Sequence, residues 1–381
     1  MKFEQLNLIE PLLQAIHKKG YLYPTPIQEK AIPSILQGRD LFGIAQTGTG
    51  KTAAFALPIL QLLTSDRDRT QKRAIRALIL APTRELASQI SEEFFLYSRS
   101  LNIRLVTVYG GVSQRPQTQA IQKGVDVMVA TPGRLLDLIQ QGFINLNRIE
   151  YFVLDEADRM LDMGFINDIK KIIAKLPSRK QTMLFSATSS PEVRNMAGSL
   201  LNNPVTVNLA PVASPPSLVS QKVYHVSQEN KKLLLAFVLQ DKLVTQALVF
   251  TRTKRGAEKV VKDLSRQGIK ADAIHGDKSQ NAREKAMKAF KNHSIRVLVA
   301  TDVASRGIDV DRLSHVINFE IPEEAETYVH RIGRTGRAEQ LGAAISFCSG
   351  NERSYLQNIH KLIKHQIEVV HGHPFVTIHK N

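Results

Sequence analysis

A glycine-rich segment near the N-terminus has the residue types that hold a nucleotide phosphate. Residues 45–52 read AQTGTGKT. Gly48 and Gly50 allow the backbone to curl until its N–H groups point inward. Lys51 adds a positive charge, and the hydroxyl of Thr52 can bind a metal ion. The helix expected after this loop directs the positive end of its dipole toward the same phosphates. The segment therefore predicts a triphosphate site.

This loop departs from the strict G-x-x-x-x-G-K-[ST] pattern at its first position, where Ala45 replaces glycine. The change adds one methyl group, which a residue with an ordinary φ accommodates. A glycine turn before an unrelated helix is the alternative interpretation. The glycine-rich loop, Lys51 and Thr52 together favour the nucleotide site over this alternative. Its predicted binding residues are Gln46, Thr47, Gly48, Thr49, Gly50, Lys51 and Thr52.

Three carboxylates follow an apolar run in YFVLDEADRM. Asp155, Glu156 and Asp158 repel one another unless a cation or hydrogen bonds lie between them. Asp155 is placed to hold Mg²⁺ together with Thr52. Glu156 is the candidate that orients and deprotonates the attacking water. If this cluster stood alone, the acidic first turn of a helix would be enough to explain it. Because the cluster follows a phosphate loop in the same chain, it predicts nucleotide hydrolysis instead.

A second cationic motif, HRIGRTGR, occupies residues 330–337. Arg331, Arg334 and Arg337 are three residues apart, so on a helix they would crowd one side. Glycine in a helix costs about 1 kcal/mol relative to alanine, which weakens such a segment further. The motif therefore requires an anion, although a solvated basic helix is the alternative. Because the second half of the chain has no phosphate loop, these arginines are expected to reach a nucleotide held by the first half.

Composition limits the class of protein and of partner. The 381 residues carry a formal net charge of +16, which favours an anionic partner. Nucleic acid is the first candidate and an anionic membrane surface the second. Apolar runs are shorter than the roughly 18 residues that span a bilayer, and the N-terminus does not have the pattern of a signal peptide. Cys348 is the single cysteine and is expected in a core, so a reducing, cytoplasmic setting is predicted.

The elements that must position these motifs alternate between short apolar runs and longer helical patterns. The runs are continuously apolar, as in strands that are buried on both faces of a parallel sheet. A proline- and serine-rich segment, APVASPPSLVSQ, interrupts the rhythm. We therefore predict two α/β domains, residues 1–208 and 221–381, with a linker at 209–220. The polar motifs follow predicted strands, where open α/β sheets bind ligands.

DEAD at 155–158, SAT at 186–188, the phosphate loop and HRIGRTGR together resemble the DEAD-box RNA helicases. The segments LDEADRMLDMGF and HGDKSQNAR are most similar to the bacterial RhlE-type branch. Alanine is common at the first loop position in this family, whereas Ser189 replaces a residue that is often bulkier and apolar. The resemblance implies two tandem RecA-like domains that bind ATP with Mg²⁺. It also implies an RNA partner, which the protein would bind through the RNA backbone without recognising the base sequence.

The resemblance also implies roles for individual residues. Tyr21 would stack on adenine, Gln28 would bind its edge and Asp309 would contact the ribose. The catalytic residues would be Lys51, Asp155, Glu156, Arg334 and Arg337, with both arginines stabilising the transferring phosphoryl group. Asp158, Ser186, Thr188 and His330 would couple the nucleotide to domain closure. Hydroxyls, backbone N–H groups and arginines bind phosphates without reading bases. The RNA contacts would come from Pro82, Thr83, Arg84, Gly111, Thr131, Arg134, Arg252, Gly276, Gln280, Arg283 and Thr301.

The sequence thus predicts an ATP-dependent RNA helicase that unwinds short duplexes locally and hydrolyses ATP to release RNA. RNA-processing or ribosome-assembly complexes are possible partners, and no membrane is expected. Two alternatives stay open. One is a DNA-directed helicase of the same superfamily, and the other is an ATP-gated RNA clamp that acts as a scaffold.

Overall fold

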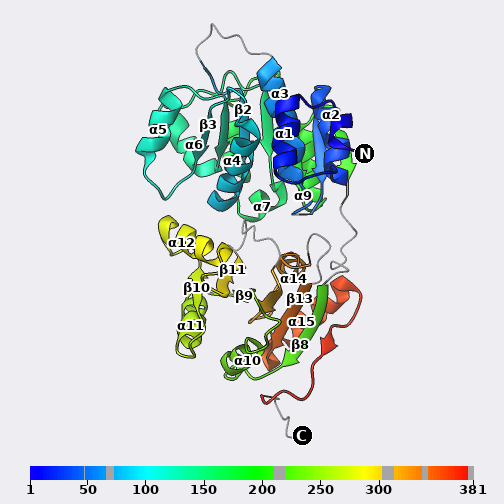
Figure 1. Ribbon diagram of the computed structural model, residues 1–381, viewed down its shortest axis with the longest axis vertical. Coiled ribbons are helices and arrows are strands. Elements are labelled where there is room, and N and C mark those ends of the chain that lie inside the picture. The colour runs from blue at the N-terminus through cyan, green and yellow to red at the C-terminus, as the bar shows by residue number, and fades with distance from the viewer. Residues whose placement is uncertain (47, 66–72, 210–218, 303–312, 337–341, 376–381) are drawn as a thin grey trace. The chain divides into compact units, whose positions relative to one another are not determined.

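The computed structural model describes the chain except residues 47, 66–72, 210–218, 303–312, 337–341 and 376–381 (Figure 1). The chain divides into two compact units, Met1–Ala210 and Pro211–Asn381, called here the first and second units. Each unit is an α/β domain built around one sheet. Of the predicted linker, 210–218 lie outside the described residues, and Val219 already begins a strand of the second unit. The described helices include none that is both long and apolar enough to span a membrane.

The first unit contains a parallel sheet in the order β3-β4-β2-β5-β6-β1-β7. Its strands are Leu41–Ile44 (β1), Ala77–Leu80 (β2), Leu105–Val108 (β3), Val127–Ala130 (β4), Tyr151–Leu154 (β5), Gln181–Ser186 (β6) and Val205–Asn208 (β7). Its helices are Glu10–Lys18 (α1), Pro26–Leu36 (α2), Lys51–Ser65 (α3), Arg84–Ser98 (α4), Gln114–Gln122 (α5), Pro132–Gln140 (α6), Ala157–Asp162 (α7), Ile166–Ile173 (α8) and Pro191–Leu200 (α9), after a 3-10 turn at Phe3–Leu6.

Two apolar cores explain why the central strands of this sheet are mainly apolar. Ile79 of β2 packs in one core with α1 to α4, whereas its neighbour Leu80 packs in the other with helices α6 to α9. Side chains of a strand alternate between the faces of the sheet, so both faces of β2 are covered. Every residue of β1, β2, β4, β5 and β6 is buried. The prediction of a doubly covered parallel sheet is confirmed.

The second unit repeats this architecture with the strand order β10-β11-β9-β12-β13-β8-β14, again parallel. Its strands are Val219–His225 (β8), Ala247–Thr251 (β9), Ala271–Ile274 (β10), Val297–Thr301 (β11), His315–Asn318 (β12), Gly342–Cys348 (β13) and Glu368–Val369 (β14). Its helices are Lys231–Val238 (α10), Lys254–Ser265 (α11), Gln280–Lys291 (α12), Ala325–Ile332 (α14) and Arg353–Ile363 (α15), with a 3-10 turn at Gly350–Glu352.

The sheet of the second unit is also covered on both faces. Val249 of β9 packs with α10 and α11, and its neighbour Phe250 packs with α12. A further core joins β13 to α14 and α15. Cys348 is buried at the end of β13, as predicted. The carboxyl ends of parallel strands therefore form one edge in each unit, and polar motifs lie along both edges.

Candidate nucleotide and RNA-binding site

Strand order brings the nucleotide motifs of the first unit together. The phosphate loop follows β1, the carboxylate motif follows β5 and SAT ends β6, and these three strands are neighbours in the order β5-β6-β1. The sequence separates the loop from SAT by more than a hundred residues. Because the strands are parallel, all three motifs meet at one edge of the sheet.

The phosphate loop curls as its glycines predict. Gly48 and Gly50 have φ values of 84° and 88°, in the left-handed region that favours glycine. The hydroxyl of Thr49 donates a 2.7 Å hydrogen bond to the carbonyl of Gln46. Lys51 begins α3 and donates from Nζ to the carbonyl of Ala45 at 2.8 Å. The ammonium group is therefore folded over the loop, and Thr47 lies outside the described residues.

Gln28 lies against this loop. Its side chain is 4% exposed, and its Nε2 donates to the carbonyl of Gly50 at 3.1 Å. Its Oε1 accepts from the backbone N–H of Thr25 at 2.9 Å, which caps α2. A β-carbon on Gly50 would collide with Nε2 of Gln28, so this contact requires glycine. Tyr21 is 45% exposed, and the ammonium of Lys19 lies 5.7 Å from its ring centroid.

Asp155 is the most deeply buried of the three carboxylates in this motif. It directly follows β5, and its side chain is 2% exposed. Burial raises the pKa of Asp155 to about 6; the positive charge of Lys51 opposes this rise, and the charges of Glu156 and Asp158 add to it. Lys51 and Asp155 therefore act on each other electrostatically, although one follows β1 and the other follows β5.

Glu156 has a strained backbone. Its φ of 54° and ψ of 52° place a non-glycine residue in the left-handed region at the start of α7. Such a conformation costs of order 1–3 kcal/mol and concentrates at functional sites. Its N–H donates to Oδ1 of Asp155 at 3.0 Å, and its carboxylate pairs with Arg159. Sequence reasoning missed Arg159, because it lies in α7 without a distinguishing pattern.

Asp158 connects α7 to the end of β6. Its Oδ2 accepts from the N–H groups of Ala187 and Thr188, both at 3.0 Å. The hydroxyl of Ser186 accepts from the same N–H of Thr188 at 3.2 Å. From the sequence, Ser186 and Thr188 are predicted to hydrogen-bond Asp158 and its neighbours; Thr188 does so through its backbone N–H, whereas the Ser186 hydroxyl contacts Thr188. Any residue types at 187 and 188 other than proline could supply these donors.

The donor set at this edge suits Mg²⁺. Among the described residues there is no group of three or more His, Cys, Asp or Glu that could hold a metal ion by itself. Mg²⁺ usually keeps several waters and binds one or two carboxylates together with substrate phosphates. A buried aspartate with a raised pKa, near a phosphate loop, fits that mode. Thr52 and Asp155 are the residues that would hold the ion.

The RNA-binding candidates of the first unit lie at the other part of the same edge. They follow β2, β3 and β4, which are neighbours in the order β3-β4-β2. Pro82 and Thr83 follow β2, and the Thr83 hydroxyl caps α4 by accepting from Leu86 N–H at 3.3 Å. Gly111 follows β3, has a φ of 77°, and a β-carbon on it would collide with Nη1 of Arg84. Gly111 and Arg84 are therefore in close contact.

Arg134 is a cation with spare hydrogen-bonding capacity. Thr131 follows β4 and precedes α6, in whose first turn Arg134 lies. The Arg134 side chain is 15% exposed and its Nε is 3.4 Å from Asp137. Its Nη1 is buried without a hydrogen-bond partner. An unsatisfied guanidinium N–H is costly, and an anionic ligand would satisfy it.

The RNA-binding candidates of the second unit follow neighbouring strands too. Arg252 follows β9, Gly276 lies two residues after β10, and Thr301 ends β11, in the order β10-β11-β9. Gln280 and Arg283 lie in the first turn of α12, whose N-terminus is capped by the hydroxyl of Ser279. The two units thus place their candidates at equivalent edges.

The arginine motif differs from the expectation. Helix α14 ends at Ile332, so Arg334 lies beyond the helix instead of sharing a face with Arg331. Gly333 is the C-cap residue, and Gly336 has a φ of 67°, in the left-handed region that a right-handed helix does not adopt. Arg331 is 2% exposed and is bound to Asp302 by hydrogen bonds of 2.6 and 2.7 Å. The anion that binds Arg331 is therefore the carboxylate of Asp302 in the same chain and not a ligand. As a lone histidine, His330 could equally have been a core residue, but the structure places it in an exposed position.

Other predictions are corrected or stay untested. Asp309 and Arg337 lie outside the described residues. From the sequence, His371, His373 and His379 favour a flexible tail over a metal site, but His373 is 7% exposed and packs against Tyr224, with ring centroids 5.4 Å apart. A strand, β14, pairs with β8 just before it and holds this segment.

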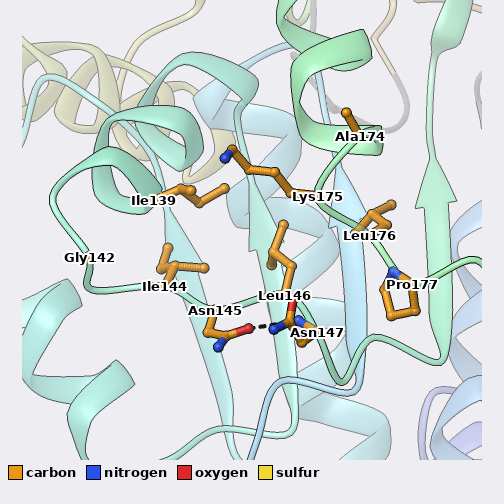
Figure 2. Close-up of a pocket in the computed structure, with 10 residues that line it drawn as sticks. All are labelled: Ile139, Gly142, Ile144, Asn145, Leu146, Asn147, Ala174, Lys175, Leu176 and Pro177. Carbon is orange, nitrogen blue, oxygen red and sulfur yellow. Dashed lines mark hydrogen bonds between the residues drawn. The ribbon is translucent and has the colours of Figure 1, made fainter.

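A surface hollow of about 660 Å³ lies away from this edge (Figure 2). Ile139, Ile144, Leu146, Leu176 and Lys175 line it. These residues come from the end of α6 and from the segments that lead into β5 and β6. The hollow therefore lies toward the amino ends of the strands and does not belong to the nucleotide site.

Comparisons with known proteins agree with this arrangement. The sequence profile of the DEAD/DEAH box helicases matches residues 25–196, and that of the helicase conserved C-terminal domain matches 229–339. The chain is 44% identical to DEAD-box ATP-dependent RNA helicase CshA of Streptococcus pneumoniae over 97% of this chain and 69% of that protein. It is 43% identical to RhpA of Helicobacter pylori over 96% of this chain and 73% of that protein.

Solved structures of related proteins are also similar. Dbp5 of S. cerevisiae bound to RNA and ADP BeF3 has a TM-score of 0.86 and 31% identity, with 97% of this chain and 95% of that chain covered. A DEAD box protein from Methanococcus jannaschii has a TM-score of 0.56 and 40% identity, with 97% and 99% covered.

Proposed function

This chain belongs to the family of DEAD-box ATP-dependent RNA helicases, and we propose that it uses ATP to unwind short RNA duplexes locally. The observation that carries the proposal is that the phosphate loop with Lys51 follows β1 and the buried Asp155 follows β5, so that both lie at the edge where three neighbouring strands end. A cationic loop and a buried aspartate at one edge suit a metal-bound triphosphate.

The residues of the first unit divide the work. The N–H groups of the loop and Lys51 would bind the phosphates, and Thr52 and Asp155 would hold Mg²⁺. The ion would neutralise charge that develops on the phosphoryl oxygens. Glu156 would orient the attacking water, and its strained backbone holds it beside Asp155. Tyr21 and Gln28 would bind adenine. The hydrogen bond from Gln28 to the carbonyl of Gly50 would link adenine binding to the phosphate loop.

The second unit would complete the ATP site. We propose that Arg334 and Arg337 stabilise charge on the transferring phosphoryl group and that Asp309 contacts the ribose. Asp158, with its N–H donors at Ala187 and Thr188, would couple this event to RNA. Support comes from the matched family profiles, which span both units. The functional domains are proposed as residues 1–208 and 221–381, joined by 209–220.

RNA would bind through its backbone at the edges described above. The candidates offer N–H groups, hydroxyls and guanidinium groups, which position phosphates without reading bases. The single cysteine, which is buried, favours a cytoplasmic location. An RNA substrate favours partners in RNA processing or ribosome assembly. Membership of the RhlE-type branch stays a prediction.

The test is the ATPase rate of the full chain with single-stranded RNA, duplex RNA and the matching DNA. RNA is expected to stimulate the rate, and strand separation is expected to require ATP. Equal stimulation by DNA would favour a DNA-directed helicase, because a protein distinguishes RNA by its 2′-hydroxyls. ATP-dependent RNA binding without turnover would favour a clamp. Glu156→Gln is expected to lower turnover by at least about a hundredfold, and unchanged turnover would remove Glu156 from its role.

A further inference from the structure

The second unit contains a buried ion pair that the proposed chemistry does not use. Lys231 of α10 and Glu352 are 0% and 1% exposed, and Nζ lies 2.5 Å from Oε2. A buried ion pair is often no more stabilising than apolar residues of the same size, because both charges lose their water. Its presence therefore calls for a role beyond stability.

The carboxylate of Glu352 accepts hydrogen bonds from three loops. Its Oε2 also accepts from the N–H and hydroxyl of Ser349, at 2.9 and 2.8 Å. Its Oε1 accepts from the N–H of Ile321 at 3.2 Å and from Nη2 of Arg252 at 3.1 Å. Arg252, Ile321 and Ser349 follow β9, β12 and β13, which are neighbours in the sheet. One carboxylate thus joins three adjacent strand ends at the edge that carries the RNA candidates.

Arg252 is held differently on its two sides. Nη2 binds the buried Glu352, whereas Nη1 lies 3.4 Å from Glu323, which is 64% exposed. The Arg252 side chain itself is 30% exposed. The inner nitrogen is therefore fixed in the protein, and the outer nitrogen faces a carboxylate that solvent reaches easily. A phosphate oxygen could replace that carboxylate without disturbing the inner contact.

We propose that Glu352 is a positioning residue for RNA, which holds Arg252 so that its outer nitrogen meets a backbone phosphate while Glu323 competes for the same place. Lys231 balances the buried negative charge of Glu352. The inference rests on the proposed function, and in particular on Arg252 as an RNA contact.

The two carboxylates give opposite predictions. A general electrostatic effect would strengthen RNA binding whenever an acidic residue is neutralised. Positioning predicts instead that loss of Glu352 weakens RNA binding and that loss of Glu323 strengthens it. Neutralising Glu352 alone would leave Lys231 buried and unpaired, so the informative variant is the double replacement Lys231→Met with Glu352→Gln. It removes both charges and leaves the net charge unchanged.

The experiment measures binding of a fluorescent single-stranded oligoribonucleotide to the full chain and the RNA dependence of its ATPase. The double replacement is expected to raise the dissociation constant about tenfold, the order expected for a charge-assisted hydrogen bond. It should raise the RNA concentration at half-maximal ATPase far more than it lowers kcat. Glu323→Gln is the matched control and is expected to lower the dissociation constant about twofold.

A structural role alone would not depend on Arg252. In an Arg252→Gln background, the double replacement is therefore expected to change RNA binding no further, although it still lowers the melting temperature. If calorimetry shows that the double replacement does not fold, Glu352→Asp keeps both charges and shortens the reach to Arg252, with the same expected weakening. Wild-type affinity in the folded variant, or an equal loss in the Arg252→Gln background, would overturn the role of Glu352. A wild-type chain that binds no RNA would overturn the proposed function instead.

Discussion

Replacing Asp155 by asparagine is expected to stabilise the ligand-free protein at neutral pH. Burial raises the pKa of Asp155 from 3.8 to about 6. Because the pKa of Asp155 is higher in the folded protein than in the unfolded chain, the folded protein binds more protons between about pH 4 and pH 6. Stability from this group is therefore lost as the pH rises through that window. The asparagine side chain would carry no charge, so the Asp155→Asn variant would not lose this stability.

The size of the effect follows from the shift. About two pKa units at about 1.4 kcal/mol each give about 3 kcal/mol above pH 6. The advantage of Asp155→Asn should be small near pH 4 and should vanish below about pH 3, where Asp155 is protonated in both states. For a unit of roughly 200 residues, about 3 kcal/mol raises the melting temperature by roughly 6–12 °C. The N–H of Glu156 can still donate to the asparagine oxygen, so this hydrogen bond need not be lost.

The assay is scanning calorimetry of the full chain between pH 4 and pH 7.5, with chelator and without nucleotide. Asp40→Asn is the matched control, because Asp40 is also buried but uses both oxygens, accepting from Thr182 N–H at 2.8 Å and Asn202 N–H at 2.7 Å. An asparagine can keep one of these bonds, so this variant should be less stable than wild type at neutral pH. Adding Mg²⁺ and ATP should reverse the order for Asp155→Asn, since ligand stabilises only the state that binds it.

A stability difference that does not change with pH would refute the reasoning. So would a variant of Asp155 that is less stable than wild type at pH 7 without ligand. Either result would mean that the carboxylate is not held at a cost in the free protein. The argument that the site is prepared for a cation would then fail, whatever the ATPase activity of the variant.

Three further predictions concern the same edge of the first unit. Lys51→Met should abolish ATPase activity and raise the pKa of Asp155 further, so that its pH-dependent loss of stability extends above pH 6; calorimetry and ATPase assays check both. Asp158→Asn keeps one side-chain oxygen to accept from the N–H groups of Ala187 and Thr188. RNA strand separation by this variant should therefore fall more than its RNA-stimulated ATPase rate. Equal losses of the two activities would contradict a coupling role for Asp158. Arg134→Gln should weaken RNA binding about equally for unrelated sequences and reduce the slope of log affinity against log salt by about 0.7, which titrations at several salt concentrations measure.

Much of the fold could be predicted because its strands are buried on both faces. Runs such as ALIL at Ala77–Leu80 have no polar alternation, which is the pattern of a covered parallel strand. β7 was missed because Val205–Asn208 is a short, partly exposed edge strand with alternating polarity. The last histidines were assigned to a tail for a related reason. The burial of His373 depends on pairing of β14 with β8, which are far apart in the sequence.

The site was predictable in its residue types and not in its contacts. Glycines at 48 and 50 require left-handed backbone, and that requirement can be read from the sequence. Strand order cannot, because it depends on which hydrophobic faces pack together in three dimensions. The separation of nucleotide residues at β5-β6-β1 from RNA candidates at β3-β4-β2 is therefore a structural finding.

That separation bears on how ATP and RNA can influence each other. Within the first unit, β2 and β5 are neighbours, and the N–H of Asp155 donates to the carbonyl of Leu80 at 3.0 Å. Pro82 and Thr83, two RNA candidates, follow Leu80 after one residue. The carboxylate that would hold Mg²⁺ is thus joined through one backbone hydrogen bond to the segment that would hold RNA. Because both segments extend from buried strands, a shift in either one is transmitted by the sheet instead of being absorbed by a loop.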